Sequence, residues 1–125
     1  MKLKVQVREK DVQGTVIEVH LPIRTVSEAN VREHWAVKAR RAKGQRETAN
    51  LMCRTYRGYG QYFGRLQVTL TRVGARFLDS DNLARSMKAV RDGIADALGI
   101  DDGSDRIKWK YAQEKGKYGV KVTIE

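Results

Sequence analysis

An aspartate-rich segment, residues 77–107, limits what this chain can fold into more than any other part of it. The segment holds seven of the eight aspartates and no glutamate. Residues 79–105 have a net charge of −4, whereas the rest of the chain carries +14. Clustered like charges oppose ionisation unless a cation is shared among them. A divalent metal site presented to a polyanion is the simplest arrangement that accounts for both halves of this charge distribution.

The same segment contains a clear helical pattern. Its apolar residues recur in steps of three and four, which is typical of an amphipathic helix with one buried face. These residues are Leu83, Met87, Val90, Ile94, Ala97 and Leu98. Asp79 or Asp81 can cap the start of this helix, and Gly99 ends it before a loop over residues 100–105.

The opposite face of this helix is polar. At 100° per residue, Arg85, Lys88 and Asp92 lie within about 40° of Asp81. The predicted helix therefore buries one face and carries a line of charged side chains that leads away from the two aspartates.

Strands are predicted on both sides of this helix. Alternating apolar residues indicate a hairpin over residues 1–7 and 15–21, ended by Pro22, and a strand over residues 66–73. Residues 107–111 and 120–124 alternate around the turn EKGKYG, which predicts a C-terminal hairpin. The expected fold is one α+β domain over residues 1–125, with a mixed, mostly antiparallel sheet and two main helices.

The other main helix is expected to begin at a capping box, Thr25 and Glu28, and to run to about Tyr56. Gly44 near its middle is expected to bend or weaken it. Residues at helical spacing along one side are expected to face the core. They are Trp35, Ala39, Ala42, Ala49, Cys53 and Tyr56.

Charge and composition limit the partners. The net charge is +10 and the pI is near 10.0, which favours a polyanionic partner, nucleic acid before membrane. No apolar run approaches the roughly 20 residues that span a bilayer, and the N-terminus has no signal-peptide pattern. The single cysteine, Cys53, excludes an internal disulfide and suits a reducing compartment. We expect a cytoplasmic protein.

A basic surface for phosphate contacts is expected on the first main helix and beside the aspartates. Its charges are nearly all of one sign, and like charges at helical spacing repel one another unless a polyanion lies against them. The candidate DNA-binding residues are Lys38, Arg40, Arg41, Lys43, Arg46 and Arg85.

The aspartates suggest metal-dependent phosphoryl chemistry. Mg²⁺ prefers oxygen ligands, and two aspartates separated by one residue at a strand-to-helix junction can converge on one ion. Such a metal activates water and stabilises charge on phosphate oxygens, while a nearby lysine neutralises the transition state. Asp-x-Asp is also a common turn or helix cap, so the spacing alone leaves a structural role open.

The segment from Leu78 to Ile107 resembles the RusA-like family of Holliday junction resolvases, particularly its phage and prophage versions. The residues that carry the resemblance are Asp79-Ser80-Asp81-Asn82-Leu83, Lys88, Asp92-Gly93-Ile94 and Asp101-Asp102. The basic stretch SEANVREHWAVKARRAKGQR also looks like a helix of those relatives, and the order of elements agrees along nearly the whole chain.

This resemblance implies a Mg²⁺-dependent homodimeric endonuclease, with Mn²⁺ as a substitute metal, that nicks two opposed strands of a four-way DNA junction. Asp79, Asp81 and Asp102 would be catalytic metal ligands, with Asp101 or Asp105 as alternatives to Asp102. The lysine of the commoner family pattern falls at Arg85 here. Lys88, one turn later, keeps a four-residue step to Asp92, so we favour Lys88 as the catalytic cation.

Two other functions remain open. One is a metallonuclease for another branched DNA substrate. The other is a non-catalytic protein that binds branched DNA and whose aspartates only cap helices. A cap needs one aspartate, however, and this helix has five around it.

Overall fold

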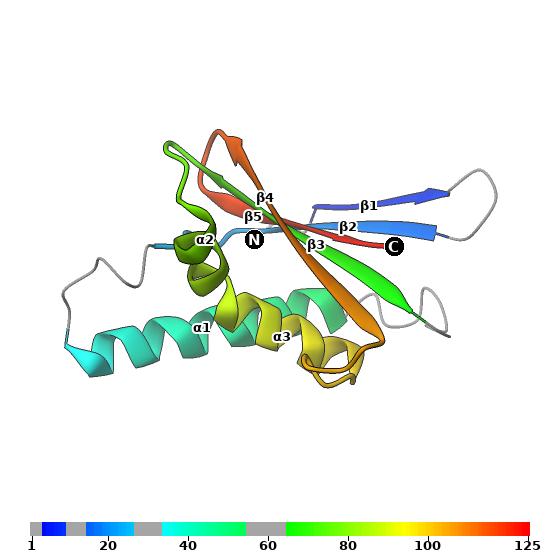
Figure 1. Cartoon of the computed structure of the whole chain (residues 1–125), viewed down its shortest axis with the longest axis horizontal. Coiled ribbons are helices and arrows are strands. Elements are labelled where there is room, and N and C mark those ends of the chain that lie inside the picture. The colour runs from blue at the N-terminus through cyan, green and yellow to red at the C-terminus, as the bar shows by residue number, and fades with distance from the viewer. Residues whose placement is uncertain (1–3, 10–14, 27–33, 55–64) are drawn as a thin grey trace.

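Five strands form one sheet, and three helices lie against one of its faces (Figure 1). The computed structural model describes residues 4–9, 15–26, 34–54 and 65–125. The elements are β1 (Lys4–Glu9), β2 (Thr15–Leu21), α1 (Trp35–Arg54), β3 (Leu66–Gly74), α2 (Ser80–Ser86), α3 (Lys88–Leu98), β4 (Ile107–Lys115) and β5 (Gly119–Ile124). None of the described helices combines the length and the apolar character that crossing a bilayer requires.

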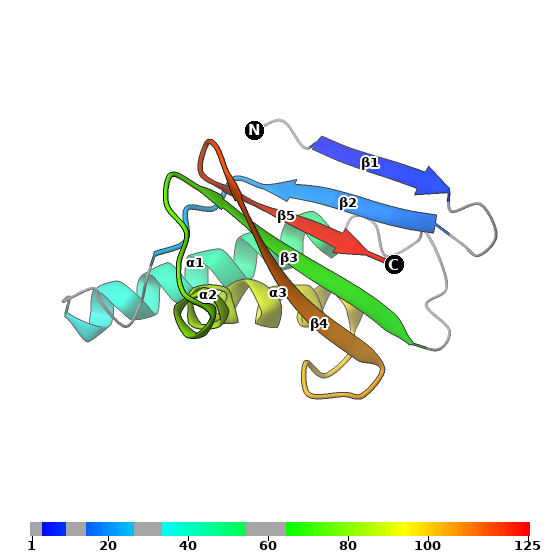
Figure 2. The same cartoon turned by 45° about the horizontal axis from the view of Figure 1, so that its top comes forward.

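The strand order is β1-β2-β5-β3-β4 (Figure 2). The β1/β2, β2/β5 and β5/β3 pairs are antiparallel, whereas β3 and β4 are parallel. Parallel neighbours need a crossover connection, and α2 with α3 supplies it. The predicted α+β class with a mixed, mostly antiparallel sheet is therefore confirmed.

The predicted C-terminal hairpin is wrong. β4 and β5 are consecutive in the chain, but β3 lies between them in the sheet. The short turn between them crosses the end of β3, where the Gly116 N–H donates to the Gly74 carbonyl at 3.1 Å. Alternation and a glycine-containing turn suggested a hairpin, but these local signals do not specify which strands pair.

The predicted start of the first main helix is also wrong. Thr25 and Val26 have no regular structure, and α1 begins at Trp35, ten residues later. Thr25 is buried, and its hydroxyl accepts a hydrogen bond from Arg72 Nε of β3 at 3.0 Å. The threonine thus satisfies a buried arginine instead of capping a helix. Glu28 lies outside the described residues.

Only the second half of α1 packs on the core. Ala49 and Cys53 are buried as predicted, and burial raises the pKa of the Cys53 thiol to about 12. Trp35 is 75% exposed, and Ala39 and Ala42 are exposed as well, so the prediction that they face the core is wrong. The reason is that the first half of α1 extends past the sheet (Figures 1 and 2). Tyr56 lies outside the described residues.

The predicted second helix is divided in two at Met87, which separates α2 from α3. Its apolar spacing is confirmed, because Leu83, Met87, Val90 and Ile94 are all buried. Gly99 ends α3 in the left-handed conformation, with φ of 69°, which glycine adopts without steric cost. The local spacing therefore predicted the buried face correctly but not the break.

α3 approaches α1 closely at Gly93. A Cβ at this position would overlap the Arg46 carbonyl and lie 2.8 Å from Ala49 Cβ of α1. Two helices can approach this closely only where the residue at the contact is a glycine, which has no side chain. By contrast, nothing lies within 4 Å of a Cβ added at Gly44, and α1 is continuous through that residue.

These two glycines give a matched prediction. We expect Gly93→Ala to lower the free energy of unfolding by about 1–3 kcal/mol, because α1 and α3 must separate. Gly44→Ala should raise it by about 0.5–1 kcal/mol, because alanine is the better helix former and meets no neighbour. Urea unfolding followed by circular dichroism measures both. Equal effects of the two substitutions would contradict the close approach at Gly93.

Candidate functional site

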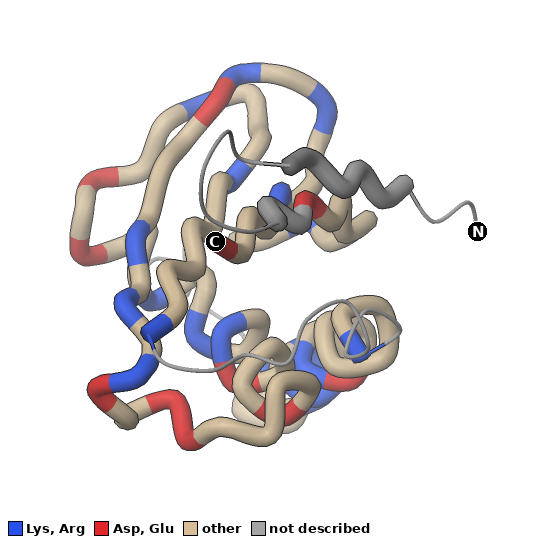
Figure 3. The backbone as a smooth tube through the Cα atoms, turned by 90° about the vertical axis from the view of Figure 1, so that its right-hand side faces the viewer, with Lys and Arg blue, Asp and Glu red and all other residues tan. Residues whose placement is uncertain are grey.

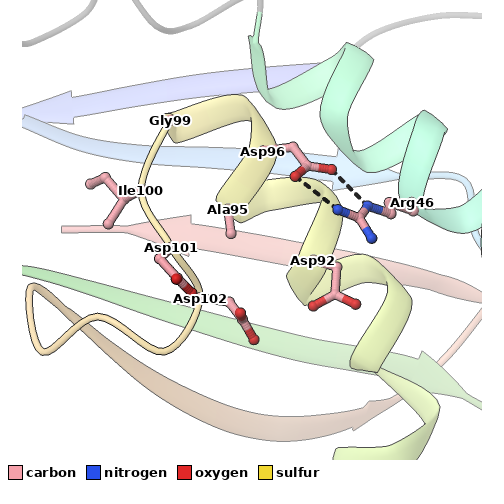
Figure 4. A pocket seen from close by; sticks show the side chains of 8 residues that line it. All are labelled: Arg46, Asp92, Ala95, Asp96, Gly99, Ile100, Asp101 and Asp102. Atoms are coloured by element: carbon pink, nitrogen blue, oxygen red, sulfur yellow. Dashed lines mark hydrogen bonds and ion pairs between the residues drawn. The ribbon is translucent and has the colours of Figure 1, made fainter.

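A pocket of about 530 Å³ lies beside α3 and is lined largely by acidic side chains (Figure 4). Asp92 and Asp96 come from α3, whereas Asp101 and Asp102 come from the loop that follows it. The other lining residues are Arg46, Ala95, Gly99 and Ile100. Figure 3 shows this loop and the helices on the same side of the sheet. The fold thus gathers four of the aspartates of the acidic segment around one space.

Lys88 connects α3 to the loop at the edge of this pocket. Its Nζ donates to Asp92 Oδ1 at 2.8 Å and to Asp102 Oδ2 at 3.2 Å. These hydrogen bonds, first to Asp92 and then to Asp102, raise the pKa of the Lys88 ammonium, and the bond from Lys88 lowers the pKa of the Asp102 carboxyl. At neutral pH Lys88 is therefore a cation suited to binding a phosphate, and Asp102 is an anion.

The main chain at Asp102 is fixed by two side chains. Arg91 Nη2 and Trp109 Nε1 donate to the Asp102 carbonyl oxygen at 2.9 Å and 3.0 Å. Arg91 also stacks over the Trp109 ring at 4.7 Å and lies 3.6 Å from Asp102 Oδ2. Our sequence reasoning missed this support. Arg91 stands one turn after Lys88, which was the available signal for it.

Arg46 of α1 forms the pocket wall that faces α3. Its Nε and Nη2 donate to the two carboxylate oxygens of Asp96 at 2.7 Å and 3.0 Å (Figure 4). This bidentate pair lowers the pKa of Asp96 and raises that of Arg46. Arg46 was predicted to contact DNA, but the structure places it in this pair, with just over half of its side chain exposed.

Asp79 and Asp81 lie at the start of α2. Asp79 is the N-cap: its Oδ1 accepts from the Asn82 N–H at 2.9 Å, and its Oδ2 accepts from Asn82 Nδ2 at 3.1 Å. Asp81 is exposed in the first turn. The residue before the cap, Leu78, is tied to β4, since its backbone N–H and carbonyl bond the Gln113 side chain at 2.8 Å each.

The structure brings Asp102 to Lys88 but does not bring Asp79 and Asp81 to Asp102. α2 precedes α3, whereas the loop that carries Asp102 follows it (Figures 1 and 2). Within residues 4–9, 15–26, 34–54 and 65–125, no three His, Cys, Asp or Glu side chains are grouped so that they could hold one metal ion. The three aspartates in this arrangement do not fit the magnesium site that the sequence suggested.

The alternatives to Asp102 lie in the same loop. Asp101 Oδ1 accepts from the Gly103 N–H at 3.0 Å and closes a local turn. Asp105 is exposed and lines a different pocket, with Arg65 and Lys108. Of the three candidates, Asp102 alone hydrogen-bonds Lys88 among the contacts of the described residues.

The remaining basic candidates do not line the acidic pocket. Lys38, Arg40, Arg41 and Lys43 belong to the first half of α1, where Arg40 and Lys43 are exposed. Arg85 is exposed in the last turn of α2. The first half of α1 thus presents a basic surface next to an acidic pocket.

Comparison with known proteins adds one relative. No family model matches the chain. A protein of Xylella fastidiosa (strain Temecula1), described as an uncharacterized protein, is 40% identical over 78 residues, which cover 58% of this chain and 51% of that protein. The chain spans about half the length of this curated relative, whose description assigns no activity.

The Lys88–Asp102 contact predicts a measurable titration effect. Because this contact lowers the pKa of Asp102, it favours the folded state at pH values above the ordinary aspartate pKa, and the benefit is lost as pH falls through the lowered value. We expect Lys88→Ala to raise the pKa of the Asp102 carboxyl, measured by NMR of the carboxyl carbons.

Arg46→Ala is the control for this titration. It should raise the pKa of Asp96 and leave Asp102 nearly unchanged, because Arg46 hydrogen-bonds only Asp96 among these carboxylates. An unchanged Asp102 titration in Lys88→Ala would contradict the contact.

Proposed function

We propose that this protein is a metal-dependent endonuclease that cleaves branched DNA, with the four-way junction as its substrate. The observation that carries the proposal is the contact between Lys88 and Asp102. These residues are fourteen positions apart, both belong to the segment that resembles the RusA-like resolvases, and their side chains lie 3.2 Å apart.

The charge and the exposure of Lys88 suit a role in phosphodiester cleavage. A lysine with a raised pKa is an ammonium at neutral pH, so Lys88 acts by electrostatic stabilisation of the phosphate and not as a proton acceptor. Its side chain is 64% exposed, which leaves it accessible to DNA. Asp92 and Asp102 hold the Nζ atom in place.

Mg²⁺, with Mn²⁺ as a substitute, belongs to the proposal through the family resemblance. When bound, such an ion would activate water and stabilise charge on the phosphate oxygens. Since Asp79, Asp81 and Asp102 are not grouped in this arrangement, we assign no step to the ion. Cleavage assays with and without Mg²⁺ or Mn²⁺ test whether the activity requires metal.

A homodimer belongs to the proposal as well. Cutting two opposed strands of a junction with two-fold symmetry calls for two sites related by the same symmetry, and a C₂ dimer supplies them. The chain has one Lys88–Asp102 pair, which gives one site for each copy. Sedimentation that finds a monomer both alone and on the junction would refute the dimer.

The first test compares cleavage of a synthetic four-way junction and of a linear duplex in Mg²⁺. We expect nicking of the junction only. Lys88→Ala should lose most cleavage while its affinity for the junction changes little. Arg85→Ala, which also removes one exposed cation near the start of α3, should be the milder change. The reverse ranking would assign the catalytic cation to Arg85.

Substitution of the aspartates by asparagine distinguishes an enzyme from a non-catalytic binding protein. Asparagine keeps the size and the capping ability of aspartate but loses its charge. We expect Asp81→Asn and Asp102→Asn to stay folded, to bind the junction, and to lose cleavage by orders of magnitude, because on the family resemblance these carboxylates would be anionic ligands of the metal ion and a neutral amide would hold it less well. Asp79→Asn should do the same, although Asp79 is also a cap.

Near-normal nicking by Asp81→Asn would mean that this aspartate is structural. The capping role of Asp79 is the observation that favours the non-catalytic alternative. Junction binding by the wild-type protein without cleavage in Mg²⁺ or Mn²⁺ would establish that alternative.

Binding itself should depend on salt. Each phosphate contact contributes a slope of roughly −0.9 to the log–log plot of affinity against salt concentration. Replacing Arg40 and Arg41 by alanine should weaken junction binding. It should also make this slope less steep, by at most the contribution of about two phosphate contacts. Fluorescence anisotropy at several salt concentrations measures both quantities, and an affinity that does not change with salt would remove the basic surface from the mechanism.

A further inference from the structure

An open groove of about 360 Å³ separates the first half of α1 from the junction of α2 and α3. Small apolar side chains and cations line both of its walls: Lys38, Ala39 and Ala42 on α1, and Arg85, Lys88 and Ala89 on the other wall. Gln45, Ser86 and Asp92 complete the lining, and Asp92 accepts a hydrogen bond from Lys88. The groove therefore combines an alanine-lined surface with three basic side chains and one carboxylate, which is paired with Lys88.

Trp35 lies on the same side of α1 as this groove. It precedes Ala39 by one helical turn and Ala42 by two, and residues at this spacing share one face of a helix. Its side chain is 75% exposed, and the ring of His34 lies 5.4 Å from it. A large aromatic side chain thus stands at the beginning of α1, in line with the alanines of the groove.

The charge of this half-helix identifies the chemistry of its occupant. Residues 34–43 contain four lysines and arginines and no acidic residue. A second copy of the chain docked here on the same surface would place four positive charges against four more. A chain of phosphates would instead offset them. An occupant that is both anionic and able to stack on an indole ring is an unpaired stretch of nucleic acid.

We propose that the groove binds a single strand of unpaired nucleotides. One base stacks on Trp35, the strand lies over Ala39 and Ala42, and its phosphates lie between Lys38 and Arg85. The strand then leads to Lys88, which hydrogen-bonds Asp102. The inference rests on the proposed function for its choice of nucleic acid, and it adds to that function a site for the unpaired strand at a branch.

Stacking does not depend on base sequence, since every base has a π face. The groove would therefore select for unpaired structure and not for sequence. A continuous duplex keeps its bases stacked on each other, so it offers nothing to Trp35.

The experiment measures binding of a fluorescein-labelled oligothymidylate of about ten nucleotides, a length within the usual range of single-strand sites. EDTA is present, so that no cleavage occurs. We expect Trp35→Ala to weaken binding about tenfold or more, and Trp35→Phe to keep most of the affinity because the ring remains. Leu51→Ala, which removes another exposed apolar side chain of α1, is the matched control and should bind as the wild type does.

Wild-type tryptophan emission should also be quenched by the oligonucleotide. The protein has one other tryptophan, Trp109, whose indole is bonded to the Asp102 carbonyl. Trp35→Phe should therefore lose most of the quenching while it keeps most of the affinity. Quenching that persists in Trp35→Phe would overturn the stacking.

A second pair of variants tests the groove. Ala42→Glu places a negative charge in it, whereas Leu51→Glu makes the same charge change on the opposite side of the same helix. We expect Ala42→Glu alone to abolish most oligonucleotide binding. Equal losses in the two variants would mean that net charge, and not the groove, governs binding, and the proposal would fail.

Two further outcomes separate this inference from others. If Ala42→Glu changes the sedimentation coefficient without DNA, the groove is an interface between copies, and the proposal is overturned. If the wild type cuts junctions but Trp35→Ala binds oligothymidylate normally, the inference fails and the proposed function stands. If oligothymidylate binding depends on Trp35 but no junction is cut, the single-strand site is supported and the proposed nuclease function is rejected.

Discussion

The arrangement of the charged groups depends on how closely α3 approaches α1 at Gly93. Without a side chain at that position the two helices come near enough for Arg46 of α1 to bond both carboxylate oxygens of Asp96. The same approach sets the width of the groove farther along α1, where Ala39 and Ala42 face the start of α3. A side chain at residue 93 would therefore alter the acidic pocket and the groove together.

The carboxylates of the acidic segment are bonded by several separate partners within the described residues. Lys88 bonds Asp92 and Asp102, Arg46 bonds Asp96, and the Gly103 N–H bonds Asp101. Of these bonds, the Arg46–Asp96 pair brings in a cation from outside the acidic segment, and the others are formed within it. Because most of these groups are partly exposed, each pair contributes little to stability. Their effect is to fix the positions and ionisation states of the side chains.

Sequence predicted what depends on local spacing and failed where distant contacts decide. The buried face from Leu83 to Ile94 follows from helical periodicity, and Gly99 follows from its freedom to adopt positive φ. The pairing of β3 with β4 could not be read from alternation, because alternation specifies a face and not a neighbour. Thr25 looked like a cap because its partner, Arg72, lies 47 residues away. In the candidate site, helical spacing placed Lys88 near Asp92, whereas the contact with Asp102 depends on how the loop folds back.

The misprediction of Trp35 has a physical cause that bears on function. Helical spacing identifies an apolar side but not what covers it, so the same stripe that buries Ala49 and Cys53 leaves Trp35, Ala39 and Ala42 in the open. Folding alone gives no benefit from an exposed indole or from cations three residues apart on a helix, since such cations repel one another. Both features become favourable if a polyanion with exposed aromatic faces lies along this half of α1. Local choices that conflict with the fold are expected where a binding surface is formed, and this half-helix contains two of them.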